Sequence, residues 1–286
     1  MTKRQMKIIK WTFSSIGILL VAMLTFLFIS FRTMGQSGES NFKELQDAGL
    51  EPVYETVLYD SSLIQTIRIG DISRPKILFV HGSPGDWTAF QSVYLDSSIN
   101  SKYCMIAFDR PGYGGTEMSA EPVLAIQANV AKRVIDAYAP NEKFIVVCHS
   151  YGGGVVSQML VDCPDRISHA VLAAPALSPS HQEPRWYNKV AKWRIVNWFI
   201  GDDMRASNAE MLGLAPSLRL IEPKLDSIKV PMVFIHGEKD ILVPYETVQY
   251  WKDHVDDQYV EYVLGDDFGH FFLFSDPEMI VNGILR

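Results

Sequence analysis

A buried strand that runs directly into a serine and then into a glycine-rich helix start constrains this chain most. The segment from Phe144 to Gly154 reads FIVVCHSYGGG, and Ser150 stands between the apolar run and the glycines. A tight strand-to-helix turn holds such a serine in a strained backbone conformation, and small residues must surround it because neighbouring backbone passes close by. The helix N-terminus adds free N–H groups and a partial positive charge. Ser150 is therefore a candidate nucleophile.

Short apolar runs alternate with helical patterns from residue 51 to the end of the chain. The expected strands are 53–59, 63–69, 76–80, 103–108, 144–148, 169–173, 230–235 and 259–264. The expected helices are 120–138, 150–161, 245–254 and 276–285. This alternation predicts an α/β fold with a mostly parallel, eight-stranded sheet and helices on both faces. In such sheets the ligand site lies at the carboxyl ends of the strands.

One stretch, residues 178–224, breaks the alternation and is interpreted as a short helical lid. It contains three of the six tryptophans, Trp186, Trp193 and Trp198. The pattern predicts a single helix over 184–200 with proline in its first turn. Two accounts of Trp186 and Trp193 stay open: they pack over the core, or they line a substrate pocket or touch a bilayer surface.

The N-terminal segment has the pattern of a membrane anchor. Residues 1–10 form a basic start, residues 11–31 carry no charge, and residues 32–50 read as a polar linker before a domain at 51–286. An uncharged helix of 21 residues is long enough to span a hydrocarbon core. The positive-inside rule places the N-terminus in the cytoplasm and the domain on the outer side, periplasmic or extracellular. A cleaved signal peptide is the competing interpretation.

Charge and cysteine usage exclude several classes of protein. The net charge is −7 overall and +5 in residues 1–32, which leaves −12 for the remainder. An acidic domain argues against a nucleic-acid partner, which needs a basic face. Cys104, Cys148 and Cys163 fit no metal spacing and suggest no disulfide framework, so we expect buried thiols and no metal.

Four motifs occur in a fixed order, each after an expected strand. They are His81-Gly82-Ser83-Pro84-Gly85, Asp109-Arg110-Pro111-Gly112-Tyr113-Gly114, Cys148-His149-Ser150-Tyr151-Gly152, and His236-Gly237-Glu238-Lys239-Asp240 with Gly269-His270. Together they resemble the α/β-hydrolase superfamily over about residues 50–286. Cys148 departs from the glycine that usually opens the elbow, and its small side chain is compatible with the turn.

The resemblance implies a catalytic triad in the chain order Ser150, Asp240, His270. Ser150 would attack a carbonyl, His270 would move the proton, and Asp240 would orient the imidazole. The backbone N–H groups of Ser83 and Tyr151 would form the oxyanion hole. We expect His149 to project elsewhere from the elbow.

Alternative roles for other histidines and acids are weaker. His81 and His236 end strands and are expected to make structural hydrogen bonds. Asp266 and Asp267 are closer to His270 in sequence than Asp240, but adjacency does not give the required geometry.

Three functions remain open from the sequence. The first is hydrolysis of a small or acyl-chain carboxylic ester, although the same triad could also cleave a thioester or a carbon–carbon bond. The second is peptide hydrolysis, because the first motif is similar to that of prolyl aminopeptidases; its substrate amine would need acids such as Glu183, Asp202, Asp203 or Glu210. The third is a non-catalytic binding protein on the same fold. No cofactor is expected, and the sequence gives no prediction of oligomeric state.

Overall fold

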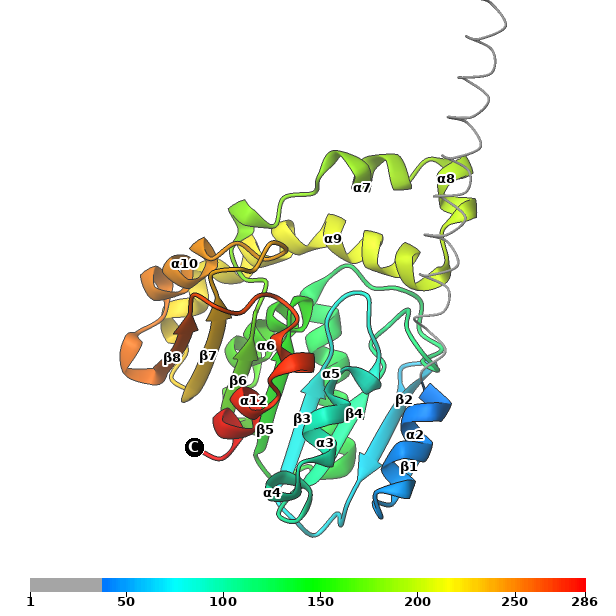
Figure 1. Ribbon diagram of the computed structural model, residues 1–286. Coiled ribbons are helices and arrows are strands. Elements are labelled where there is room, and N and C mark those ends of the chain that lie inside the picture. Colours follow the sequence, from blue (N-terminus) through cyan, green and yellow to red (C-terminus); the bar gives the residue numbers. More distant parts are fainter. Residues whose placement is uncertain (1–37) are drawn as a thin grey trace, which may run out of the picture. The chain divides into compact units, whose positions relative to one another are not determined.

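The computed structural model describes residues 38–286, and Asn41–Arg286 forms one compact unit (Figure 1). This unit starts earlier than the predicted boundary at residue 51, because helix α2 (Gly38–Asp47) lies in the expected linker and buries Leu45. Within residues 38–286 no helix is both long and apolar enough to cross a bilayer. The anchor predicted for residues 11–31 lies outside the described residues.

An eight-stranded sheet forms the centre of the domain, as predicted. Its strands are β1 (Pro52–Tyr59), β2 (Ser62–Ile69), β3 (Lys76–Val80), β4 (Cys104–Phe108), β5 (Phe144–His149), β6 (Ile167–Ala173), β7 (Met232–Gly237) and β8 (Val260–Gly265). The order is β1-β2-β4-β3-β5-β6-β7-β8. Strand β2 pairs antiparallel with both β1 and β4, whereas every pair from β4 to β8 is parallel.

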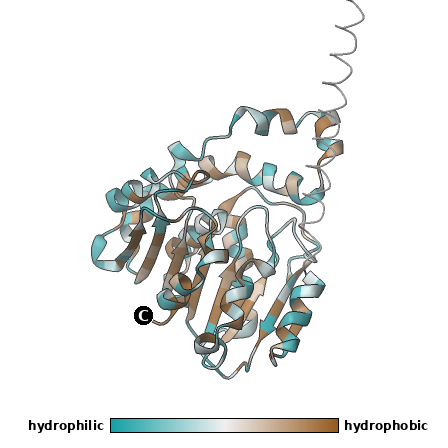
Figure 2. Ribbon diagram, in the orientation of Figure 1, coloured by the Kyte–Doolittle hydropathy of each residue, from teal (hydrophilic) through white to brown (hydrophobic). Residues whose placement is uncertain are grey.

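Helices cover both faces of the sheet because the central strands are apolar on both sides. Leu78 and Val80 of β3 pack toward one face, and Ile77 and Phe79 pack toward the other. The first face carries α5 (Leu124–Tyr138), α6 (Tyr151–Asp162) and α10 (Glu246–His254). The second carries α2, α3 (Gln91–Leu95), α4 (Ser97–Asn100), α11 (Phe272–Ser275) and α12 (Glu278–Ile284). Figure 2 shows the strands as the most hydrophobic part of the domain.

The lid differs from the single helix predicted over 184–200. Two short helices occur there, α7 (Trp186–Ala191) and α8 (Arg194–Phe199), because the backbone at Trp193 is extended. Short helices without a buried apolar stripe gain little from packing, and Asn188 is the residue that α7 buries. The longest lid helix, α9 (Asp202–Ile221), lies between α7 and the sheet (Figure 1). It buries Leu214 and Leu218 against the core.

Candidate active site

Three side chains predicted to act together meet at the carboxyl ends of the parallel strands. Ser150 follows β5, Asp240 follows β7, and His270 follows β8. His270 Nε2 lies 3.0 Å from Ser150 Oγ, and His270 Nδ1 lies 2.7 Å from Asp240 Oδ2. The structure therefore joins the serine, the histidine and the aspartate in one hydrogen-bonded line.

The turn at Ser150 has the strained backbone expected of the elbow. Its φ is 54° and its ψ is −121°, a backbone region that residues other than glycine seldom occupy. Three backbone hydrogen bonds fix it: Ser150 N donates to Ala173 O at 3.0 Å, and Ser150 O accepts from Ala176 N at 3.0 Å and from Gly153 N at 2.8 Å. A Cβ on Gly152 would lie 2.4 Å from Val80 O, so glycine is required there. The strain is thus held by neighbouring strands and leaves the Ser150 hydroxyl facing His270.

Cys148 is compatible with the same turn. Its side chain is fully buried in the core between the sheet and α6, and burial raises the pKa of its thiol. It is therefore a packing residue.

Asp240 is held in place as a carboxylate. Its Oδ1 accepts hydrogen bonds from the backbone N–H groups of Leu242 at 2.9 Å and Val243 at 2.8 Å. Burial alone would raise the pKa of Asp240, but the hydrogen bond and charge of His270 and these two N–H donors outweigh it and lower the pKa. An ionised Asp240 accepts the Nδ1 proton of His270, which leaves Nε2 free to take a proton from Ser150.

His149 lies beside His270, so the prediction that it projects elsewhere is wrong. Its Nε2 lies 2.9 Å from the backbone oxygen of His270, and the two ring centroids are 4.7 Å apart. Burial, followed by the proximity of His270, lowers the pKa of His149 to about 3. A neutral His149 can donate its Nε2 proton to that oxygen and so supports the loop that carries His270.

His81 and His236 have the structural hydrogen bonds expected of them. His81 Nε2 accepts from Arg110 N at 3.0 Å, so its Nδ1 donates to Gly82 O at 2.8 Å. His236 Nε2 lies 3.1 Å from Val243 O.

The loop after β3 lies directly against the elbow. A Cβ on Gly82 would lie 3.1 Å from the Cβ of Ser150, so backbone passes next to the nucleophile there. The hydroxyl of the next residue, Ser83, is 3.0 Å from Tyr113 Oη and 2.9 Å from Ser207 Oγ, which fixes this side chain toward the lid. Tyr151 is the first residue of α6, where backbone N–H groups have no acceptor within the helix. Of the predicted oxyanion donors, Tyr151 N thus follows Ser150 directly in the chain, and Ser83 N belongs to the loop whose Gly82 lies against Ser150.

A buried ion pair, which the sequence did not predict, connects this loop to the lid. Arg110 and Glu210 are both fully buried, and Arg110 Nη1 donates to Glu210 Oε1. The same guanidinium donates to His81 O at 3.0 Å and to Gly82 O at 2.8 Å. Tyr113 Oη donates to Glu210 Oε2 at 2.7 Å. The guanidinium of Arg110 therefore links helix α9 to the backbone of the two residues that precede Ser83.

Exposed apolar side chains follow two members of the triad in the chain. Ile241 and Leu242 directly follow Asp240, and Phe271 directly follows His270. The Phe271 ring lies 5.1 Å from the His270 ring, and Phe274 lies 6.2 Å beyond it. Phe271 and Phe274 are more than half exposed, although Phe272 and Leu273 between them are buried. We call these four exposed side chains, Ile241, Leu242, Phe271 and Phe274, the apolar rim.

The remaining predicted residues are placed differently. Trp186 and Trp193 are 75% and 66% exposed, so these side chains do not pack over the core. A role in a substrate pocket stays a prediction. Among residues 38–286 no cluster of histidine, cysteine and carboxylate side chains is arranged to hold a metal ion.

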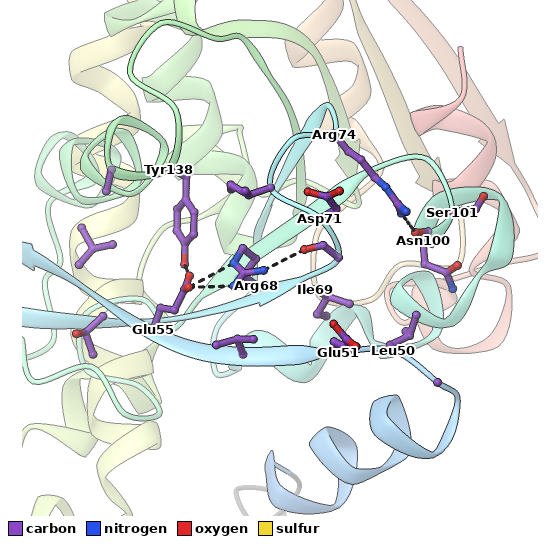
Figure 3. A pocket seen from close by; sticks show the side chains of 17 residues that line it. Leu50, Glu51, Glu55, Arg68, Ile69, Asp71, Arg74, Asn100, Ser101 and Tyr138 are labelled. Atoms are coloured by element: carbon purple, nitrogen blue, oxygen red, sulfur yellow. Dashed lines mark hydrogen bonds and ion pairs between the residues drawn. The ribbon is translucent and has the colours of Figure 1, made fainter.

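A groove of about 1090 Å³ lies at the opposite end of the strands (Figure 3). The register pairs Ile69 of β2 with Met105, so the groove opens near the amino end of β4. Both of its arginines are already engaged: Arg68 pairs with Glu55 at 3.2 Å, and Arg74 donates to Asn100 O at 2.8 Å. We assign no chemistry to it.

Comparisons with known proteins agree with this fold. The model of the Alpha/beta hydrolase family matches residues 77–282. A Mycoplasma pneumoniae protein named as an esterase/lipase is 23% identical over 239 residues, which are 74% of this chain and 88% of that protein. The acetyltransferase component of the acetoin cleaving system of Cupriavidus necator is 34% identical over 133 residues, 45% of this chain. The chain spans only 34% of that relative's length.

Solved structures share the fold at low identity. A protein of Acinetobacter baumannii described as a lipase has a TM-score of 0.66 at 16% identity, over 86% of this chain and 93% of its own. A bacterial membrane phospholipase A has a TM-score of 0.61 at 18% identity, over 99% of this chain and 97% of its own.

Proposed function

The chain belongs to the alpha/beta hydrolase family, and on this premise we propose that it is a serine hydrolase that cleaves carboxylic esters through an acyl-enzyme on Ser150. The observation that carries the proposal is the continuous line from Ser150 Oγ to His270 at 3.0 Å and on to Asp240 at 2.7 Å. A serine hydroxyl is a poor nucleophile without such a base. A binding protein would have no need of this arrangement.

The proposed reaction has two halves. Ser150 Oγ attacks the carbonyl carbon while its proton passes to His270 Nε2, and the negative charge that forms on the carbonyl oxygen is stabilised by Ser83 N–H and Tyr151 N–H. Collapse breaks the ester bond, and His270 gives its proton to the departing alcohol. Water then attacks the acyl-enzyme by the same proton route, which releases the acid and restores Ser150. Asp240 stabilises the imidazolium in both halves.

The apolar rim supports a substrate with an apolar acyl group. Ile241 and Phe271 each neighbour a member of the triad and are exposed in the free protein. Such side chains gain free energy when an acyl chain covers them. An ester with a medium or long acyl chain is therefore the substrate class that the site favours.

The aminopeptidase alternative loses most of the acids it needs. Glu183 pairs with Arg219, Asp202 pairs with Arg205, and Glu210 is buried against Arg110. Asp203 is the remaining acid of the four, and burial, followed by the charges of Asp86 and Asp202, raises its pKa. One acid with a raised pKa is a weak site for a substrate ammonium group.

The test uses the full chain in mild detergent with p-nitrophenyl esters of increasing acyl length and a panel of aminoacyl amides. Ester turnover that Ser150→Ala abolishes, with labelling of Ser150 by a phosphonate, would support the proposal. Ser157→Ala is the matched control, since Ser157 is a buried serine of the same helix that bonds to Gly154 O at 2.8 Å. Turnover of amides with little ester turnover would favour the peptidase. Absence of both turnover and labelling would reject an enzyme.

We also propose that the chain is a single-pass membrane protein with its catalytic domain on the outer side. The support is the uncharged run at residues 11–31 and the basic residues before it. The fold also serves a membrane phospholipase A. Washing membranes with carbonate should leave the protein in the pellet, and its release into the supernatant would contradict the anchor.

A further inference from the structure

The outer part of the lid, residues 184–201, exposes an unusual number of aromatic side chains. We call this segment the outer lid; it comprises α7, α8 and their flanking residues. Its exposed aromatic residues are Trp186, Tyr187, Trp193, Trp198 and Phe199. The three tryptophans are 66–77% exposed, whereas Trp87 and Trp251 in the body are 3% and 0% exposed. Tryptophan is buried for most of its surface in ordinary folded domains, so this exposure indicates a surface with a partner.

The charge of the outer lid is opposite to that of the chain. Residues 184–201 contain four cations and no acid, in a chain of net charge −7. The cations are Arg185, Lys189, Lys192 and Arg194, all exposed. Within residues 38–286 none of them forms an ion pair. The partner is therefore expected to be negatively charged.

The outer lid is attached to the body by hydrogen bonds to α9, where Arg205 Nη1 donates to Ile200 O at 2.8 Å and to Asn197 O at 3.1 Å. Asn188 Nδ2 donates to Asn208 Oδ1 of α9 at 3.0 Å, and Asn208 Nδ2 donates back to Asn188 O at 3.2 Å. Figure 1 shows α7 beyond α9, away from the sheet. The exposed aromatic groups are thus not part of the core, and they can contact a flat surface without disturbing the triad.

From aromatic exposure, unpaired cations and this position, we propose that the outer lid docks on an anionic phospholipid surface. Tryptophan and tyrosine prefer the interface between headgroups and acyl chains, and lysine and arginine bind anionic headgroups. The proposal does not depend on catalysis, because its test uses an inactive chain.

The test measures which tryptophans lie near lipid. The full chain with Ser150→Ala and Trp11→Phe is reconstituted into lipid nanodiscs whose acyl chains are brominated or unbrominated. Of the five remaining tryptophans, three lie in the outer lid and two are buried, so quenching by bromine reports the outer lid. Discs of phosphatidylcholine alone are compared with discs that also contain phosphatidylglycerol.

We expect bromine to quench the emission strongly in phosphatidylglycerol discs and weakly in phosphatidylcholine discs. The variant Lys189→Gln/Lys192→Gln/Arg194→Gln should lower the docked-to-undocked ratio about fivefold per cation, or roughly a hundredfold in total. The variant Trp186→Gln/Trp193→Gln/Trp198→Gln should remove the quenching. Emission unaffected by bromine in both lipids would overturn the proposal, as would equal quenching in both. A change in tryptophan emission that depends on protein concentration and not on bromine would identify a second copy of the chain as the partner instead.

Discussion

Replacing Glu210 by glutamine tests how the lid is joined to the active site. Both Glu210 and Arg110 are fully buried, and the change leaves the guanidinium without its counter-charge. Three neutral acceptors would remain for Arg110: His81 O at 3.0 Å, Gly82 O at 2.8 Å and Gln127 Oε1 at 2.7 Å. Removing one partner of a buried pair costs about 3–5 kcal/mol, since a charge stays buried without compensation. That is a large part of a typical free energy of unfolding, about 5–15 kcal/mol.

The assay is urea unfolding of the full chain in mild detergent, followed by tryptophan emission. Glu183→Gln is the matched control in the same lid, because Glu183 and Arg219 form an ion pair with both side chains half-exposed. The control should lose no more than about 1 kcal/mol. The double variant Arg110→Met/Glu210→Leu should recover much of the loss, because neither charge is left unpaired. A loss in Glu210→Gln no larger than in the control would refute the reasoning.

The same change should also slow catalysis. Arg110 holds the backbone oxygens of His81 and Gly82, which directly precede the proposed oxyanion donor Ser83. If that loop shifts, one donor is lost, which costs about 10²–10³-fold in kcat. KM should change little, because the substitution leaves the apolar rim unchanged. An unchanged kcat in a folded variant would show that the ion pair does not position the loop that carries Ser83.

Three further predictions concern the site itself. Asp240→Asn should lower kcat about 10⁴-fold in the ester assay with the fold intact, because the imidazole loses its charge partner; a drop of less than tenfold would contradict the assigned role. Gly152→Ala should cost about 3 kcal/mol of stability or prevent folding, since a Cβ would lie 2.4 Å from Val80 O. Gly201→Ala is the control: a Cβ there has nothing within 4 Å, so this change should cost less than about 1 kcal/mol in the same urea assay. His149 has a folded pKa of about 3 and an ordinary value of 6.5, so the unfolded chain binds a proton first and stability is lost as the pH falls from 6.5 toward 3. The variant His149→Gln lacks this titration, so its free energy of unfolding should fall by about 1.4 kcal/mol less per pH unit across that range than that of the unchanged protein. If the free energies of unfolding of the two proteins changed in parallel with pH, this would be contradicted.

The sheet was predictable because its strands are apolar on both faces and end in polar motifs. The predicted strand 76–80 matches β3 at both ends, and the others differ by a residue or two at their ends. Ser150, Asp240 and His270 were predicted because the motifs that contain them resemble those of the α/β-hydrolase superfamily. Each also follows a strand, and the carboxyl ends of parallel strands lie at one edge of the sheet. The family resemblance and the sheet topology thus carried most of the site.

Long-range contacts of charged or polar residues outside the triad could not be predicted. Arg110 and Glu210 are 100 positions apart, and nothing in either segment marks a charge that will be buried. His149 was misplaced for the same reason, since its partner is the backbone of His270. The prediction of a single lid helix over 184–200 was wrong, because an amphipathic pattern does not show whether the body of the domain covers the apolar residues of the helix. These features depend on which surfaces meet, and one sequence does not contain that information locally.

The buried pair between Glu210 of α9 and Arg110, which follows β4, also limits how α9 can move. Swinging α9 away would separate Arg110 from Glu210 at about 3–5 kcal/mol, so such a state would be populated in roughly one molecule in 10²–10³ or fewer. The outer lid is bonded to α9 through Asn188 and Asn208, and through Arg205, which donates to the backbone oxygens of Asn197 and Ile200. These groups are only partly buried, so less free energy holds them than the fully buried pair. Any opening of the lid is therefore expected to move the outer helices before α9, which stays held to the loop beside Ser150.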